Sequence, residues 1–154
     1  MSRVEGSLID FAVRLQQNGE KAVKGVSGIM QTNAEKIRDT AIEYAPILTG
    51  ALENAIVKNT ENNGINGRAV VTVYIDESGE AGKYAADVHE HLAPWGDGSF
   101  GRVGGSDLNS LSMQKDGGTG LVGGKFLERA FLFYKDKIRR DCERVVNRAF
   151  NNDF

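Results

Sequence analysis

Residues 20–45, EKAVKGVSGIMQTNAEKIRDTAIEYA, decide the fold of this chain. Apolar residues recur there every three or four positions, which places them in one stripe along a helix. These residues are Val23, Val26, Met30, Ala34, Ile37, Ala41 and Ala45. The spacing predicts a helix of about 26 residues, about 39 Å long. Pro46 ends it, because the residue before a proline is driven out of the α region. Gly25 and Gly28 either loosen its first turns or let another backbone approach closely.

A second, shorter amphipathic helix is predicted upstream, over residues 4–16. Its stripe consists of Val4, Leu8, Phe11, Ala12 and Leu15. Asn18-Gly19 is expected to end it, because both residue types tolerate the left-handed conformation of a helix stop. Residues 1–19 are therefore an N-terminal helical arm.

A turn and a hairpin are predicted after Pro46. Thr49 is a plausible N-cap for one short helical turn. Residues 54–60 and 68–76 alternate as strands do. The seven residues 61–67 between them contain two Asn-Gly dipeptides, which favour a hairpin. The two segments are thus expected to pair antiparallel, while residues 84–91 leave helix and strand both open.

A C-terminal helix is predicted over residues 125–150. Its apolar stripe is Leu127, Ala130, Phe131, Tyr134, Ile138, Cys142, Val145 and Ala149. An opposing basic row consists of Lys137, Arg140, Arg144 and Arg148. Asp136 with Arg140 and Arg139 with Glu143 have the spacing of i,i+4 ion pairs. The row is interpreted either as a solvated helix face or as a surface for a polyanion.

A long glycine-rich loop is predicted over residues 92–123, and residues 92–124 hold ten of the nineteen glycines. Loops of this length are normally functional or disordered. Trp95 and Phe100 are large apolar side chains that need a cover. They are candidate anchors for contact with another subunit.

Composition limits the class of protein. A chain of 154 residues, 40% apolar and 26% charged, is expected to form a single domain over residues 1–154. The net charge is −2, with −5 over residues 1–124 and +4 over residues 125–150. One cysteine excludes an intramolecular disulfide. No apolar run is long enough to span a membrane, and the N-terminus lacks a secretory signal core.

No motif makes an enzyme well supported. His89 and His91 would face the same way on a strand and could share a metal with Asp87, but surface or partly buried histidines are the favoured interpretation. Cys142 lies in an apolar stripe, which favours a core residue over a nucleophile. Lys125 is followed by Phe126, so the phosphate-loop pattern fails. We therefore assign no catalytic residue, no cofactor and no metal.

Three strings of sequence, taken in order, carry a resemblance. They are YAPILTGAL at residues 44–52, YAADVHE at residues 84–90 and GKFLERA at residues 124–130. Their order and spacing resemble those of the neck proteins of tailed bacteriophages, also called head–tail connection, tail-completion or minor capsid proteins. The resemblance covers residues 20–150. Members of that family usually cross from the second string to the third in fewer residues than this chain does.

The resemblance implies an α+β fold, with a small antiparallel curved sheet packed by a long helix from the N-terminal half and by a C-terminal helix. It implies a structural virion protein rather than an enzyme, assembled in the host cytoplasm into a hexameric or twelvefold ring at the head–tail junction. The implied partners are further copies, portal or connector proteins, and tail-terminator or tail-tube proteins. The glycine-rich loop would act as an arm on a neighbouring copy, and the basic row could face passing genomic DNA. The alternative functions are a nucleic-acid-binding module that uses the basic row and a hydrolase that binds metal at His89 and His91.

Overall fold

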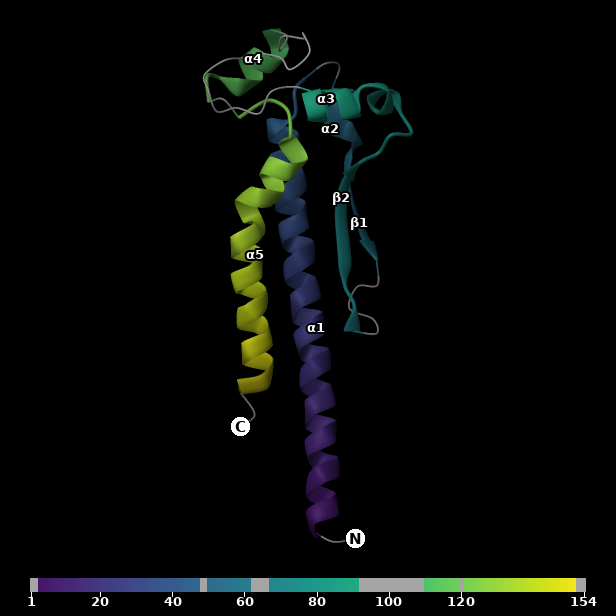
Figure 1. The fold of residues 1–154 in the computed structure, drawn as a ribbon, viewed down its shortest axis with the longest axis vertical. Coiled ribbons are helices and arrows are strands. Elements are labelled where there is room, and N and C mark those ends of the chain that lie inside the picture. The colour runs from purple at the N-terminus through teal and green to yellow at the C-terminus, as the bar shows by residue number, and fades with distance from the viewer. Residues whose placement is uncertain (1–2, 48–49, 62–66, 92–109, 120, 152–154) are drawn as a thin grey trace. The chain divides into compact units, whose positions relative to one another are not determined.

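The computed structural model describes residues 3–47, 50–61, 67–91, 110–119 and 121–151. The fold is α+β, as the sequence predicted, and consists of a two-stranded antiparallel sheet packed with a long N-terminal helix and a C-terminal helix (Figure 1). In chain order the elements are α1 (Arg3–Tyr44), α2 (Ala51–Ala55), β1 (Ile56–Glu61), β2 (Val70–Ile75), the 3-10 helix η2 (Glu80–Lys83), α3 (Ala85–His91), α4 (Ser110–Asp116) and α5 (Phe126–Asn151).

The chain forms two compact units, and each unit draws on separate parts of the sequence. Unit 1 contains Met1–Asn33, Thr60–Val71 and Asp136–Phe154. Unit 2 contains Ala34–Asn59 and Thr72–Lys135.

Helix α1 is one continuous helix of 42 residues. The prediction that Asn18-Gly19 ends a separate arm helix is wrong. Leu15 and Ala22 lie seven residues apart, so the apolar stripe passes through the Asn-Gly pair without a change of phase. Asn18 itself is buried, with 3% of its surface exposed. Burial of Asn18 and Ala22 therefore outweighs the helix-propensity cost of about 1 kcal/mol for Gly19.

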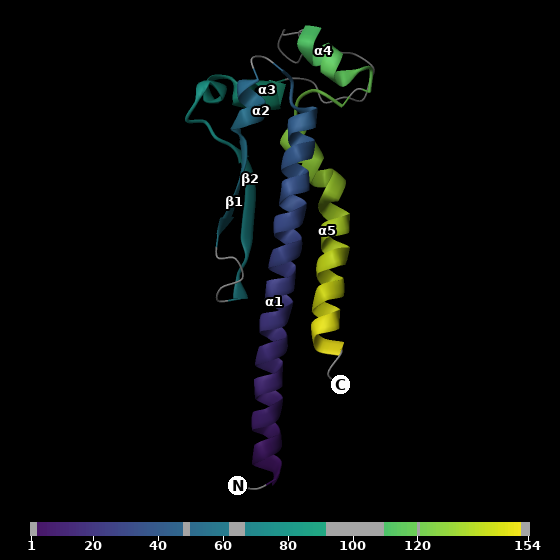
Figure 2. The same ribbon diagram turned by 180° about the vertical axis from the view of Figure 1, so that it is seen from behind.

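In unit 1 the first part of α1 packs against the last part of α5. The two helices run antiparallel and lie side by side in both views (Figures 1 and 2). They approach closely at Gly25, where an added Cβ would lie 2.5 Å from Val145 Cγ1. The sequence left open whether these glycines loosen the helix or permit close approach of another backbone. Gly25 permits close approach, although by a side chain of α5. At Gly28 nothing lies within 4 Å of an added Cβ.

These two glycines provide a matched test of the α1–α5 contact. We expect Gly25→Ala to lower the free energy of unfolding by about 1–3 kcal/mol, because the new methyl overlaps a stiff valine. We expect Gly28→Ala to raise it by about 0.5–1 kcal/mol, because only the helix propensity improves there. Urea unfolding followed by circular dichroism measures both. Val145→Ala should restore stability to the Gly25→Ala protein. Equal stabilisation by the two alanines would contradict close packing at Gly25.

Helix α1 continues beyond the end of α5 within unit 1. Helix α5 ends at Asn151, six residues past Val145, which is about 9 Å along the axis. Because the helices are antiparallel, its end is level with the region of Gly19 in α1. Side-chain exposure agrees, because every residue from 10 to 17 is exposed and the next one, Asn18, is buried. We call residues 3–17 of α1 the overhang (Figure 2).

The hairpin was predicted correctly, apart from the exact ends of its strands. β1 and β2 are hydrogen-bonded neighbours in a two-stranded sheet, and residues 62–66 of the connecting segment lie outside the described residues. In unit 2, β1 is tied to α1. The Arg38 side chain donates to the Ile56 carbonyl at 3.2 Å, and Lys58 pairs with Glu35 at 2.6 Å.

The short helical turn after Pro46 is α2. Its N-cap residue is Gly50, at φ 78°, with no side-chain cap hydrogen bond. The predicted cap, Thr49, lies outside the described residues.

The prediction of a loop over residues 92–123 is wrong for its last part. Residues 110–116 form α4, and Ser112, Asp116 and Val122 are almost fully buried. Gly117 and Gly118 follow α4 with φ of 56° and 80°, a conformation that glycine adopts without strain. Part of the glycine content therefore serves a helix stop in unit 2. Residues 92–109, with Trp95 and Phe100, lie outside the described residues.

Candidate functional site

The three strings that carry the resemblance meet in one place in unit 2. Each of them supplies almost fully buried apolar side chains: Ala45 and Leu52 from the first, Ala85 and Val88 from the second, Phe126 and Ala130 from the third. We call this cluster the string junction. Sequence reasoning found the strings but not that they pack together, because they are far apart along the chain.

Backbone hydrogen bonds also hold the string junction together. The Gly123 N–H donates to the Tyr44 carbonyl at 2.9 Å, and the Lys125 N–H donates to the His89 carbonyl at 2.8 Å. The start of α5 is thereby attached both to the end of α1 and to α3. The Arg129 guanidinium lies 5.0 Å from the centre of the Tyr44 ring, a cation–π contact between α5 and α1.

Lys125 has an unusual backbone conformation at this point. Its φ is 55°, the only positive φ among the described residues other than glycine. A glycine would adopt it more easily, but the lysine side chain also pairs with the Glu90 carboxylate. The hydrogen bond from Lys125, with a smaller effect from the His89 hydrogen bond, holds the pKa of the Glu90 carboxyl below its ordinary value. The strained residue is thus used to link α3 to α5.

Helix α4 is fastened to the end of α1 and to α2. The Lys115 ammonium donates to the carbonyls of Ile42 and Ala45 at 2.6 and 2.8 Å, and it pairs with Glu53. A cation is favourable there, because the last carbonyls of a helix are unpaired and carry partial negative charge. The Ser112 hydroxyl accepts from the Ile47 N–H at 2.8 Å.

Asp116 organises the turn that follows α4. Its Oδ1 accepts from the N–H groups of Leu121 and Val122, at 2.7 and 2.9 Å, and from the Thr119 hydroxyl at 3.1 Å. Lys115 and Asp116 were missed in the sequence, because they lie in a stretch interpreted as a loop. A lysine next to an aspartate is no signal by itself, since both types are usually solvated.

The strand-based metal hypothesis is wrong in its premise. Residues 85–91 form the helix α3, where positions two apart point in directions about 160° from each other. His89 Nδ1 lies 2.8 Å from Glu90 Oε1, and the imidazole meets the Phe126 ring edge-on at 5.0 Å. His89 therefore packs in the string junction. Over the described ranges, no three His, Cys, Asp or Glu side chains gather closely enough to hold a metal.

Cys142 lies half-buried in α5, so it is less buried than the core residue that its place in the apolar stripe predicted. Burial, followed by the charges of Asp141 and Glu143, raises the pKa of its thiol. An activated nucleophile needs the opposite shift.

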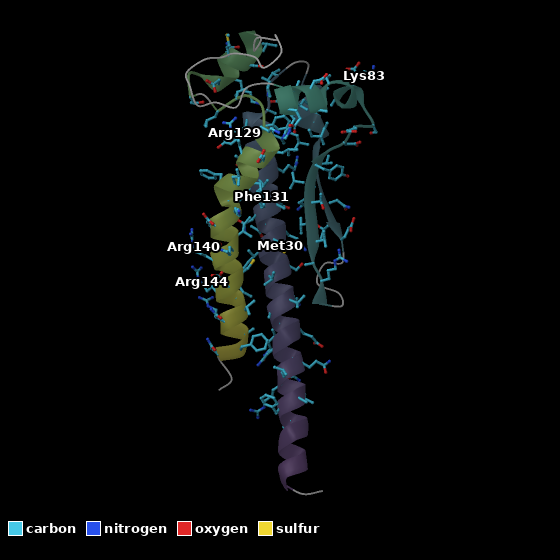
Figure 3. The ribbon with its side chains drawn as sticks, viewed as in Figure 1. Met30, Lys83, Arg129, Phe131, Arg140 and Arg144 are labelled. Carbon is cyan, nitrogen blue, oxygen red and sulfur yellow. The ribbon has the colours of Figure 1, made fainter. Side chains whose placement is uncertain are left out.

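The four residues of the basic row are all exposed on α5. Figure 3 shows Arg140 and Arg144 pointing away from α1. Lys137 and Arg144 both pair with Asp141. The predicted pairs Asp136–Arg140 and Arg139–Glu143 do not form in this fully described part of α5.

Comparison with protein-family models, with curated proteins and with solved structures finds no match to this chain. In the part of the chain that the structure covers, no helix is both long enough and apolar enough to span a membrane.

Proposed function

We propose that this chain is a structural subunit of a phage neck, located in the virion and forming a ring that joins head to tail. The ring, hexameric or twelvefold, would lie between a portal or connector protein and a tail-terminator or tail-tube protein. The proposal starts from the three strings and is supported by their convergence in one packed junction. Such a subunit needs surfaces for its neighbours and no catalytic group.

The observation that carries the proposal is the overhang of α1. Phe11 and Leu15 are 51% and 49% exposed, although they lie on the same helix face as the buried Asn18 and Ala22, seven residues further on. The apolar stripe that packs on α5 thus continues past the end of its partner.

We infer that a second copy of this chain covers the overhang. A ring requires a heterologous contact, in which two different surfaces of one chain meet on neighbouring copies. The chain offers further exposed apolar side chains for this, because Leu132 and Phe133 on α5 are 53% and 70% exposed, and Phe131 is 48% exposed on another side of the helix. Trp95 and Phe100 remain candidates for subunit contact, because large aromatic side chains are common interface anchors.

Charged substitutions on opposite faces of the overhang test this contact. We expect the unaltered protein to form rings in native mass spectrometry and negative-stain images, alone or on purified head or tail particles. Phe11→Glu with Leu15→Glu should give monomers, because each buries a charge in the interface. Val13→Glu is the control, because Val13 is 48% exposed but lies on the opposite face. It should assemble normally.

Two results would contradict the proposal separately. A strict monomer that binds neither heads nor tails would rule out the neck role. Rings that form equally well with and without the Phe11 and Leu15 substitutions would exclude the overhang as the contact. Circular dichroism at equal concentration checks that all variants remain helical.

A further inference from the structure

The basic row forms a straight line of charge on one face of α5. With about 100° per residue, Lys137, Arg140, Arg144 and Arg148 fall within an arc of about 80°. Along the axis they cover about 16.5 Å, in steps of about 4.5 and 6 Å. The apolar stripe of the same helix lies about 120° away and faces α1 at Gly25. The row is therefore free of the packing in unit 1.

Acidic neighbours compensate only part of this charge. Asp141 pairs with both Lys137 and Arg144, and the hydrogen bond from Lys137 holds the pKa of Asp141 below its ordinary value. Arg140 and Arg148 form no ion pair with any carboxylate among the described residues. Arg140 and Arg148 are thus unpaired within the described part of the chain, and Lys137 and Arg144, which share one carboxylate, keep further N–H donors for a phosphate.

A shallow, open depression lies along this face. It is lined by Arg140, Glu143, Arg144, Asn147, Arg148 and Asn151. Guanidinium groups match the paired oxygens of a phosphate, and asparagine amides add neutral donors. We propose that this face of α5 binds the sugar–phosphate backbone of double-stranded DNA. This activity goes beyond the neck role and does not require the ring.

Duplex DNA fits the face better than other polyanions. Its strands each carry one charge per about 3.4 Å of axis, a regular spacing that a rigid row of cations can follow. The depression contains no aromatic side chain, whereas proteins that bind single strands stack bases on aromatic rings. An anionic membrane is disfavoured, because an interfacial helix inserts its apolar face and here that face packs on α1.

The test compares two double charge reversals on the same helix. Arg140→Glu with Arg144→Glu alters the row. Lys135→Glu with Arg139→Glu, two exposed residues on a different face, changes the net charge by the same amount. A labelled 20-base-pair duplex is titrated with full-length protein in 50, 100 and 200 mM salt, and binding is followed by fluorescence anisotropy.

We expect the unaltered protein to bind about 100-fold more weakly at 200 mM than at 50 mM salt, as four phosphate contacts predict. The row variant should lose at least about 10-fold in affinity at 50 mM and about two units of salt slope. The Lys135 and Arg139 variant should lose less than about 3-fold. This difference separates a defined face from a general effect of net charge.

The proposal is overturned by absence of duplex binding at 50 mM salt, or by equal losses in the two variants. Binding of polyglutamate through the row, with no binding of the duplex, would instead assign the face to an acidic protein partner. Native mass spectrometry of the row variant distinguishes this failure from a failure of the neck proposal, because ring formation should be unchanged in it.

Discussion

Replacing Phe126 by alanine is expected to lower the free energy of unfolding by about 3–5 kcal/mol, the usual range for a fully buried phenylalanine. Phe126 is 0% exposed and begins α5. Its ring meets His89 of α3 edge-on. The substitution therefore leaves a cavity where the three strings meet, and it removes the side chain that packs α5 against α3.

Phe133→Ala is the matched control for this prediction. Phe133 is on the same helix and is 70% exposed, so its loss should cost less than about 1 kcal/mol. Urea unfolding at low protein concentration, followed by circular dichroism, measures both variants without interference from assembly. Similar costs for the two phenylalanines would contradict the string junction as the core of unit 2.

Asp116→Ala is expected to lower the free energy of unfolding by about 2–4 kcal/mol. The change removes the acceptor for two backbone N–H groups, and Val122, which carries one of them, is 2% exposed. A hydrogen bond to a charged group contributes about 1.5–3 kcal/mol, and a buried donor left without a partner adds its own cost. Residues 117–123 should then detach from the end of α1, because the Gly123–Tyr44 hydrogen bond depends on this turn.

Asp116→Asn tests whether the acceptor geometry or the charge matters more. All three hydrogen bonds described for Asp116 end on Oδ1, and asparagine keeps an oxygen there. We expect a smaller loss than for alanine, because the oxygen that accepts these three hydrogen bonds is kept while their charge assistance disappears. Amide hydrogen exchange at Leu121 and Val122 provides a local measurement. Fast exchange in the alanine variant alone would show that the position of the acceptor oxygen matters more than its charge. Unchanged exchange in both variants would contradict the role of Asp116 in this turn.

Segments were predicted correctly where a local pattern of apolar residues defines them, and incorrectly where distant contacts decide. The helices and the hairpin were predicted because their apolar residues repeat with a local period. The Asn18-Gly19 stop was wrong because a local signal of about 1 kcal/mol competed with the burial of α1 from Asn18 onward. The choice between helix and strand for residues 84–91 was left undecided, because apolar and polar residues are mixed there without a dominant period.

The candidate sites divide in the same way. The basic row could be predicted, since four cations at helical spacing define a face from sequence alone. The string junction could not, because its contacts join residues about 35–80 positions apart. Nor could the roles of Lys115 and Asp116, because most of their partners are backbone carbonyl and N–H groups, which leave no mark in the sequence.

The sequence by itself determined the α+β class, the two amphipathic helices, the hairpin and the basic face, because each depends on periodicity or on charge within one segment. Only the tertiary structure decided that α1 runs unbroken past the end of α5, that Gly25 receives Val145, and that α4 closes over the end of α1. Those features depend on contacts between segments that are far apart in the sequence. The composition of one segment does not reveal which other segment it will pack against.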